Sequence, residues 1–169
     1  MKKTVHAVSL SAVLLLAGCA SYSWRPSVPA ESRTVAVPVF RNATDVSALG
    51  SVVTSQVLRE FQREGTYVIA SPGDAALEVQ GELVSSSSPS VAYERRTGAR
   101  TREHRFRAKA VVSFIDKRSG KVLVDKRKYT AETTFLANDD ILTGERDASG
   151  RIAEDIARQI VDDATSLAW

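Results

Sequence analysis

Cys19 is the only cysteine in this chain of 169 residues, and its thiol is a strong candidate nucleophile. The chain before it has two lysines at positions 2 and 3, a mostly apolar stretch at 8–17 and then Gly18. A positive start, about ten apolar residues and small residues before a cleavage point are typical of a secretory signal peptide. The apolar stretch is too short to span a membrane as a helix. Residues 1–18 are therefore predicted to be removed, which leaves Cys19 as the new N-terminus.

The sequence Leu16-Ala17-Gly18-Cys19 resembles a bacterial lipobox, in which the cysteine sulfur receives a diacylglyceryl group before cleavage. The resemblance implies that Cys19 carries diacylglycerol and an N-acyl lipid, and several acyl chains make a stable membrane anchor. Ala20 stands where an aspartate would retain a lipoprotein in the inner membrane, so the outer membrane is expected. The alternative is an ordinary signal peptide followed by an incidental cysteine, although no second cysteine exists to form a disulfide.

Basic side chains form the second group with clear chemistry. Residues 94–130 contain 13 basic and 4 acidic side chains, whereas residues 131–169 contain 3 basic and 9 acidic ones. An arginine guanidinium matches phosphate and carboxylate groups through its fork of donors. The candidate binding residues are Arg95, Arg96, Arg100, Arg102, Arg105, Arg107 and Lys109.

This uneven charge indicates a polyanionic partner. Nucleic acid does not fit an exported and acylated protein, so anionic lipid or lipopolysaccharide (LPS) is the expected ligand. Two alternatives stay open. The basic strands could only balance the acidic C-terminal segment, or they could form a protein interface or a solvated face.

Catalytic and metal chemistry find little support in the sequence. His104 is the only histidine after residue 18, and it shares a predicted strand face with apolar residues, which indicates a packed structural role. The sequence contains no GxSxG, HExxH or phosphate-binding glycine loop. Asn138, Asp139 and Asp140 precede two apolar residues where a calcium loop would need ligands. The chain is therefore predicted not to be an enzyme. It is also expected to bind no metal and no cofactor, apart from the lipid attached to Cys19.

Strands and turns must position these residues. Alternating or β-branched stretches predict strands over 33–40, 66–70, 100–115 and 122–135, and one further strand in two parts, 76–84 and 91–96. The serine-rich segment 85–90 predicts a bulge or loop within a long hairpin. Residues 116–121 are predicted to form a turn, and residues 136–150 a polar loop.

Two helices are predicted. The first covers 45–64, with capping residues in "NATD" before it and Gly65 as its end. The second covers 148–167, with Asp147 or Ser149 as its cap. Apolar side chains recur at spacings of three or four in both helices, at Val46, Leu49, Val53, Val57 and Phe61 and at Ile152, Ile156, Ile160 and Ala164.

The fold class is therefore α+β, with two helices packed on one face of a mixed four- to five-stranded sheet, in the order β-α-β-β-β-β-α. A lipidated tether precedes this fold. The predicted domains are a signal peptide at 1–18, an acylated tether at 19–32 that is rich in proline and serine, and a single periplasmic α+β domain at 33–169.

Taken together, several motifs resemble the LPS-assembly lipoprotein family, the LptE family. They are the acylated cysteine, "RTVAVPVFRNAT", "LREFQREG", "ALEVQGELV", the basic hairpin, "DKRSGKVLVDKRKYTAETTF" and a final amphipathic helix that ends in tryptophan. The resemblance covers nearly the whole mature chain. It implies an outer-membrane lipoprotein that sits as a plug in the LPS-translocon β-barrel, supports assembly of that barrel and helps pass LPS to the outer leaflet. The alternatives are a structural outer-membrane lipoprotein with a different protein partner and a lipid-anchored hydrolase.

Overall fold

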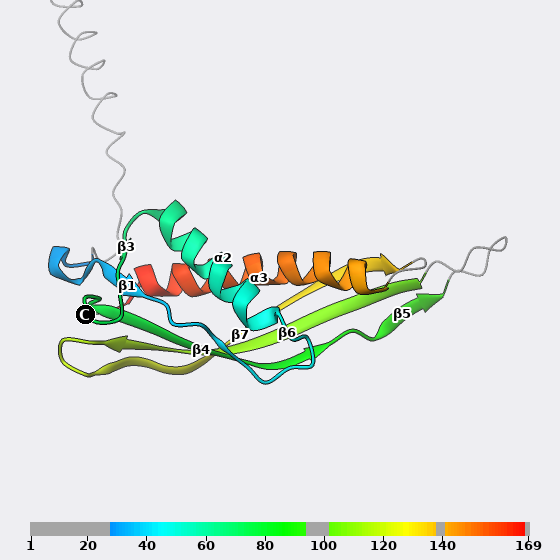
Figure 1. The fold of residues 1–169 in the computed structure, drawn as a ribbon, viewed down its shortest axis with the longest axis horizontal. Helices are drawn as coiled ribbons and strands as arrows, with labels where there is room; N and C mark the ends of the chain where they lie inside the picture. The colour runs from blue at the N-terminus through cyan, green and yellow to red at the C-terminus, as the bar shows by residue number, and fades with distance from the viewer. Residues whose placement is uncertain (1–27, 94–101, 138–140, 168–169) are drawn as a thin grey trace, which may run out of the picture.

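The computed structural model describes residues 28–93, 102–137 and 141–167. Two helices lie on one face of a long mixed sheet (Figure 1), which confirms the predicted α+β class. Helix α3 packs along β6 and β7, and helix α2 packs against α3 and the β3 side of the sheet. The elements are η2 (Ala30–Ser32), β1 (Thr34–Ala36), β2 (Arg41–Asn42), α2 (Leu49–Glu64), β3 (Val68–Ile69), β4 (Leu77–Ser87), β5 (Ser90–Tyr93), β6 (Arg102–Asp116), β7 (Val122–Ala137) and α3 (Ile141–Thr165).

The sheet has β6 at its centre. One edge of β6 pairs antiparallel with β7 along nearly its whole length, and the other edge pairs with β4 and then with β5. On the far side of β4, the short strands β1 and β2 run parallel to it, and β3 runs parallel to β1. The described residues form seven strand segments rather than four or five, because β2 adds a two-residue pair and a break at residues 88–89 separates β4 from β5.

The core lies between the helices and the sheet. Phe106 and Phe114 of β6 are fully buried, as are Val53 of α2 and Ile156 of α3. Burying one such apolar side chain contributes about 1.5–3 kcal/mol. The predicted apolar stripes are confirmed from Leu49 to Phe61 in α2 and from Ile152 to Ala164 in α3, because both helices turn these residues inward, whereas Val46 precedes α2 and is only partly buried.

Helix α2 begins at Leu49, four residues later than predicted. The "NATD" segment forms a turn instead of a helix cap, because the Asn42 side chain holds it: Nδ2 donates to the carbonyls of Val46 and Ser47, and Oδ1 accepts from Thr44. The predicted end is confirmed. Gly65 has φ of 82° and its amide donates to the carbonyl of Phe61, which closes the last turn.

The prediction of a polar loop over 136–150 is wrong from Ile141 onward, because α3 already begins there. Asp147 and Ser149 therefore lie inside the helix and not at its cap, and the Ser149 hydroxyl donates to the carbonyl of Glu145 at 2.7 Å. Gly144 explains how this turn packs. A Cβ atom at that position would lie 2.5 Å from Cδ2 of Phe135, so only glycine lets the helix approach that ring.

The final residues of the predicted tether belong to the folded domain. Val28 is buried, and residues 30–32 form η2 with Ser32 fully buried. The Arg33 side chain donates to the carbonyl of Val28 at 3.0 Å, and Arg118 donates to the Ser32 hydroxyl at 2.7 Å. The chain is thus fixed at this point beside the turn that joins β6 and β7.

Candidate functional site

The helix-free face of the sheet carries the basic residues predicted on β6. Arg105, Arg107 and Lys109 are exposed, whereas the alternating residues Phe106 and Ala108 are fully buried on the helix side. Successive side chains of a strand point to opposite faces, so one strand supplies both the core and a charged surface. The predicted alternation of faces is therefore confirmed in this part of β6.

Neighbouring strands place hydroxyl groups beside these cations. On β7, Thr134 and Thr130 lie opposite Arg105 and Lys109, and on β4 two exposed serines lie opposite Lys109 and Arg107. Directly opposite residues share a face, with Cβ atoms about 4.5–5.5 Å apart. We call this surface the basic patch, and its members are Ser85, Ser87, Arg105, Arg107, Lys109, Thr130, Glu132 and Thr134.

Arg107 is already paired within the basic patch. Its Nε donates to Oε2 of Glu132 at 2.9 Å, and its Nη2 contacts the same oxygen. These hydrogen bonds, together with the positive charge of Arg107, lower the pKa of the Glu132 carboxyl from its usual value. Within the described residues, neither Arg105 nor Lys109 forms an ion pair. These two cations are therefore available to an anionic ligand.

The patch also contains a bulge in β4. Its pairing with β6 shifts register between Leu83 and Ser85, and the strand continues to Ser87 before the break at Ser88 and Pro89. The prediction of a bulge or loop in the serine-rich segment is confirmed. Because of this shift, two serine hydroxyls stand beside the basic side chains, where they can donate to or accept from a sugar or phosphate oxygen.

The remaining predicted site residues are only partly covered by the structure. Arg95, Arg96, Arg100 and Cys19 lie outside the described residues. Arg102 starts β6, where its backbone pairs with β5 and β7, but its side chain is not described. The structure therefore brings together Arg105, Arg107 and Lys109 and leaves the other members of the predicted set as a prediction.

His104 is packed inside the domain. It is 8% exposed, its ring stacks on Phe135 with centroids 5.4 Å apart, and its Nδ1 lies 3.5 Å from the carbonyl of Ser88. Within the described residues, its Nε2 has no hydrogen-bond partner. The ring therefore packs on Phe135, the residue opposite it on β7.

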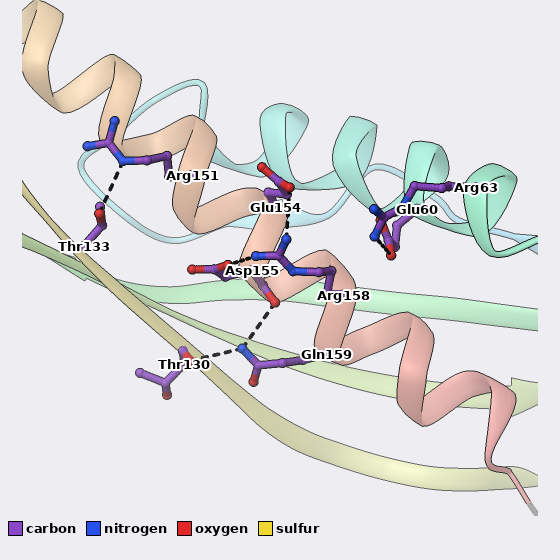
Figure 2. Close-up of polar contacts among 9 residues, drawn as sticks. All are labelled: Glu60, Arg63, Thr130, Thr133, Arg151, Glu154, Asp155, Arg158 and Gln159. Carbon is purple, nitrogen blue, oxygen red and sulfur yellow. Dashed lines mark hydrogen bonds and ion pairs between the residues drawn. The ribbon is translucent and has the colours of Figure 1, made fainter.

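Helix α3 protects the outer edge of β7, a feature that the sequence did not predict. Figure 2 shows Arg151 and Gln159 reaching from the helix toward β7. Arg151 donates to the carbonyl of Thr134 at 3.2 Å, and Gln159 donates to that of Thr130 at 3.4 Å. In the described part of the sheet β7 pairs only with β6, so these carbonyls would otherwise be open to a strand of another molecule. No local sequence pattern predicts these hydrogen bonds, because they depend on how α3 crosses β7.

The same helix is held to β7 by Asp163. Its carboxylate accepts from the Tyr129 hydroxyl at 2.6 Å and pairs with Arg127 at 2.8 Å. Burial, followed by the neighbouring carboxylate, raises the pKa of Tyr129. The pairing with Asp163 likewise raises the pKa of Arg127, so Arg127 is a structural cation and not part of the basic patch.

A second concave feature lies between the first turns of the two helices. This cavity of about 400 Å³ is lined by Val46, Leu49, Val52 and Leu142, with several polar side chains. The cavity therefore offers apolar contacts, and its lining has no histidine or cysteine that could act as a catalytic base or nucleophile.

Two further properties concern the described residues alone. No group of three or more histidine, cysteine, aspartate or glutamate side chains could hold a metal ion there. The candidate residues Asn138, Asp139 and Asp140 lie outside this part of the chain. No described helix has the length and apolar character needed to cross a membrane.

Comparison with solved structures supports the fold. The chain is similar to a minor lipoprotein from Acinetobacter baumannii, with 12% identity and a TM-score of 0.53 over 80% of this chain and 96% of that one. It is also similar to a hypothetical protein from Chlamydia trachomatis, with 14% identity and a TM-score of 0.51 over 78% and 95% of the two chains. At these identities the similarity concerns the fold alone.

Comparison by sequence identifies the family. No curated protein gives a significant match to the chain. Residues 32–164, which include every described strand and all but the last residue of α3, match the family described as LptE, lipopolysaccharide-assembly. The predicted resemblance is thus confirmed, and the chain belongs to the lipopolysaccharide-assembly family LptE.

Proposed function

We propose that this protein is an outer-membrane lipoprotein that assists assembly of the LPS-translocon β-barrel and delivers LPS toward the outer leaflet. Its family supports a role in LPS assembly at the outer membrane. The observation that carries the proposal is the basic patch, where Arg105 and Lys109 are exposed beside hydroxyl groups and form no ion pair among the described residues. The proposed role is binding and assembly without catalysis, and the only cofactor is the lipid on Cys19.

The chemistry of the basic patch fits phosphorylated sugars. Guanidinium and ammonium groups attract phosphate, and serine and threonine hydroxyls both donate to and accept from sugar hydroxyls. In open solvent at physiological salt, charges act over about 8 Å, so these contacts depend on close approach. A ligand or barrel wall that excludes water would strengthen them. The seven predicted basic residues, including those of the hairpin tip, would then contact LPS or acidic groups inside the barrel.

A charge reversal tests this binding. The double variant Arg105→Glu with Arg107→Glu should bind LPS about tenfold more weakly than the wild type and with greater sensitivity to salt. A matched control reverses two exposed arginines of the helices, Arg59→Glu with Arg146→Glu, and should bind normally. Circular dichroism checks that both variants fold. If the folded patch variant binds LPS like the control, the patch is only a solvated face.

The lipid anchor needs its own test. Mass spectrometry of the mature protein should find acyl chains on Cys19, and the protein should fractionate with the outer membrane. Cys19→Ser removes the thiol that forms the thioether, so it should leave an uncleaved or displaced precursor. Normal fractionation of this variant would contradict the anchor.

The partner is tested by purification of the lipidated protein from outer membranes. Co-purification of a large β-barrel that binds LPS would support the proposal. A stable complex with an unrelated protein, together with unchanged LPS binding in the charge-reversal variant, would favour a structural lipoprotein.

A further inference from the structure

The two free cations of the basic patch have a regular separation. Arg105 and Lys109 lie four residues apart on β6, which pairs with β7 without a register shift over residues 102–112. At about 3.3 Å per residue, their Cα atoms are about 13 Å apart on the same face of the sheet. Phe106 and Ala108 are fully buried beneath this part of the strand, so the fold fixes the separation of the two backbone positions.

Each free cation lies beside at least one hydroxyl group. Thr134 of β7 lies directly opposite Arg105, and Thr130 of the same strand lies opposite Lys109. On the other edge of β6, Ser85 of β4 also lies opposite Lys109. A cation with a neighbouring hydroxyl can hold one phosphate group, because the charge attracts the phosphate and the hydroxyl donates a hydrogen bond to it. The patch therefore contains two similar anion subsites.

An ion pair occupies the position between the two subsites. Arg107 lies midway between them, where its Nε donates to Oε2 of Glu132 at 2.9 Å and its Nη2 contacts the same oxygen. An incoming phosphate could bind Arg107 only by displacing this carboxylate, and it would then lie close to a second negative charge. The ion pair thus disfavours a phosphate at the middle of the patch.

The charges around the patch leave its net charge positive. Its three cations and one carboxylate give a net charge of +2. On the same face of these strands, one carboxylate (Glu103) and one cation (Lys128) flank the patch and cancel each other. Glu82 of β4 is offset by its ion pair with Arg41. The surface therefore attracts a ligand that carries more than one negative group.

We propose that the basic patch recognises its ligand by two phosphate groups at once, one held at Arg105 and the other at Lys109. This inference rests on the proposed function, because the fitting ligand is LPS whose sugar end carries two phosphates. Once the first phosphate is bound, the second is held near its own subsite, so each contact strengthens the other. The ion pair of Arg107 and Glu132 adds specificity, because it withholds the middle cation from a ligand with a single phosphate.

The experiment uses the purified lipidated full chain and two probes, lipid A with two phosphate groups and lipid A with one. Both affinities are measured in the same detergent and at the same salt concentration. The wild type should bind the diphosphorylated form about tenfold more tightly, because the other form lacks one charge-assisted contact. Equal affinities of the wild type for the two forms would overturn the inference.

A neutral substitution at one subsite separates two-point recognition from general charge attraction. Lys109→Gln should lose about tenfold in affinity for the diphosphorylated lipid and much less for the monophosphorylated one, which can still use the subsite at Arg105. Lys128→Gln is the matched control, because it removes an exposed cation from the same face outside the patch. It should leave the ratio of the two affinities unchanged. An equal fall of this ratio in both variants would mean that only total charge matters.

Glu132→Gln tests the role of the ion pair. Arg107 is then free, and a single phosphate can contact two neighbouring cations about 7 Å apart. The monophosphorylated lipid should therefore bind about fivefold more tightly, and the preference for two phosphates should fall. Glu103→Gln removes the same charge from the same face and should strengthen both lipids equally. Equal changes of the ratio in these two variants would contradict the role of Glu132. Circular dichroism checks that every variant folds.

The outcomes also separate this inference from the proposed function. A wild type that binds neither form of lipid A would contradict the basic patch as an LPS site. Equal binding of the two forms, together with weaker binding by the double variant Arg105→Glu with Arg107→Glu, would leave the LPS site intact and refute only the recognition of two phosphates.

Discussion

The two faces of the fifteen-residue strand β6 differ in burial and in how much substitution they tolerate. On the helix side, Phe106, Ala108 and Ala110 are completely buried, and each is fixed by its neighbours. On the other side, Arg105 and Lys109 are exposed and touch no acidic partner among the described residues. The packed face tolerates little change in volume or charge. The open face can change its ligand chemistry while the fold stays the same.

A charge placed on the packed side of the sheet should cause the largest loss of stability. Ile156 is fully buried in α3, so Ile156→Asp leaves a carboxylate without a partner and should cost several kcal/mol. Chemical denaturation measures the loss. Glu154→Asp introduces the same residue on the exposed face of the same helix and should change stability little. An unchanged midpoint for Ile156→Asp would mean that α3 does not pack on the sheet as described.

Added volume on the packed side should have the next largest effect. Gly144→Ala puts a Cβ atom 2.5 Å from the Phe135 ring, which must move against His104, and should destabilise the protein by about 1–3 kcal/mol. Gly150→Ala is the matched control, because nothing lies within 4 Å of its added Cβ. As an alanine inside a helix, it should stabilise by about 0.5–1 kcal/mol. Equal effects of the two variants would contradict the packing of the first turns of α3.

Glu78 is an exception on the helix-free side of the sheet, because this charged residue of β4 is buried. Its hydrogen bonds to Lys117 and then to Gln80 lower the pKa of its carboxyl from the usual 4.5. A lowered pKa in the folded state contributes stability above pH 4.5, and that contribution is lost as the pH falls through the folded value.

Glu78→Gln should therefore be less stable than the wild type by about 1 kcal/mol near neutral pH, and the difference should vanish in acid. Denaturation curves between neutral and acidic pH test this. Glu82→Gln is the control on the same strand, because its ion pair with Arg41 is long, at 3.8 Å, and exposed. A difference for Glu78→Gln that stays constant with pH would show that the ion pair is not its source.

The edge of β7 should give the smallest change in stability. Arg151→Ala with Gln159→Ala removes two exposed donors and should cost only about 0.5–1 kcal/mol. The freed carbonyls should nevertheless increase self-association at high concentration, measured by sedimentation. Arg158→Ala is the control, because Arg158 contacts Glu154 and Asp155 of its own helix (Figure 2). Equal self-association of both variants would show that α3 does not protect this edge.

Local periodicity predicted most of the fold. The alternation along β6 and the apolar stripes of both helices depend on spacing alone, and all are confirmed. The start of α3 could not be read in this way, since glycines at 144 and 150 lower helix propensity and only the Phe135 ring reveals why the first is needed. Likewise, the turn before α2 depends on one asparagine side chain.

The candidate site was predictable to a similar degree. The sequence placed Arg105, Arg107 and Lys109 on one face of a strand, because this requires only the alternation of side chains. It did not predict that Glu132 would neutralise the middle cation, since that contact joins residues 25 positions apart and depends on the register between β6 and β7. The serine hydroxyls of the patch depend on the β4 bulge for the same reason.

The continuity of β6 also sets a rule for how the domain can change in length. Its fifteen residues span about 45–50 Å, from the hairpin side to the turn that holds Ser32. Unless a bulge like the one in β4 absorbs it, insertion of a single residue would exchange the two faces beyond that point, sending arginines into the core and phenylalanines into solvent. Without a bulge, only paired insertions or deletions preserve both faces, and each pair changes the separation between the cations of β6 and the N-terminal attachment by about 7 Å.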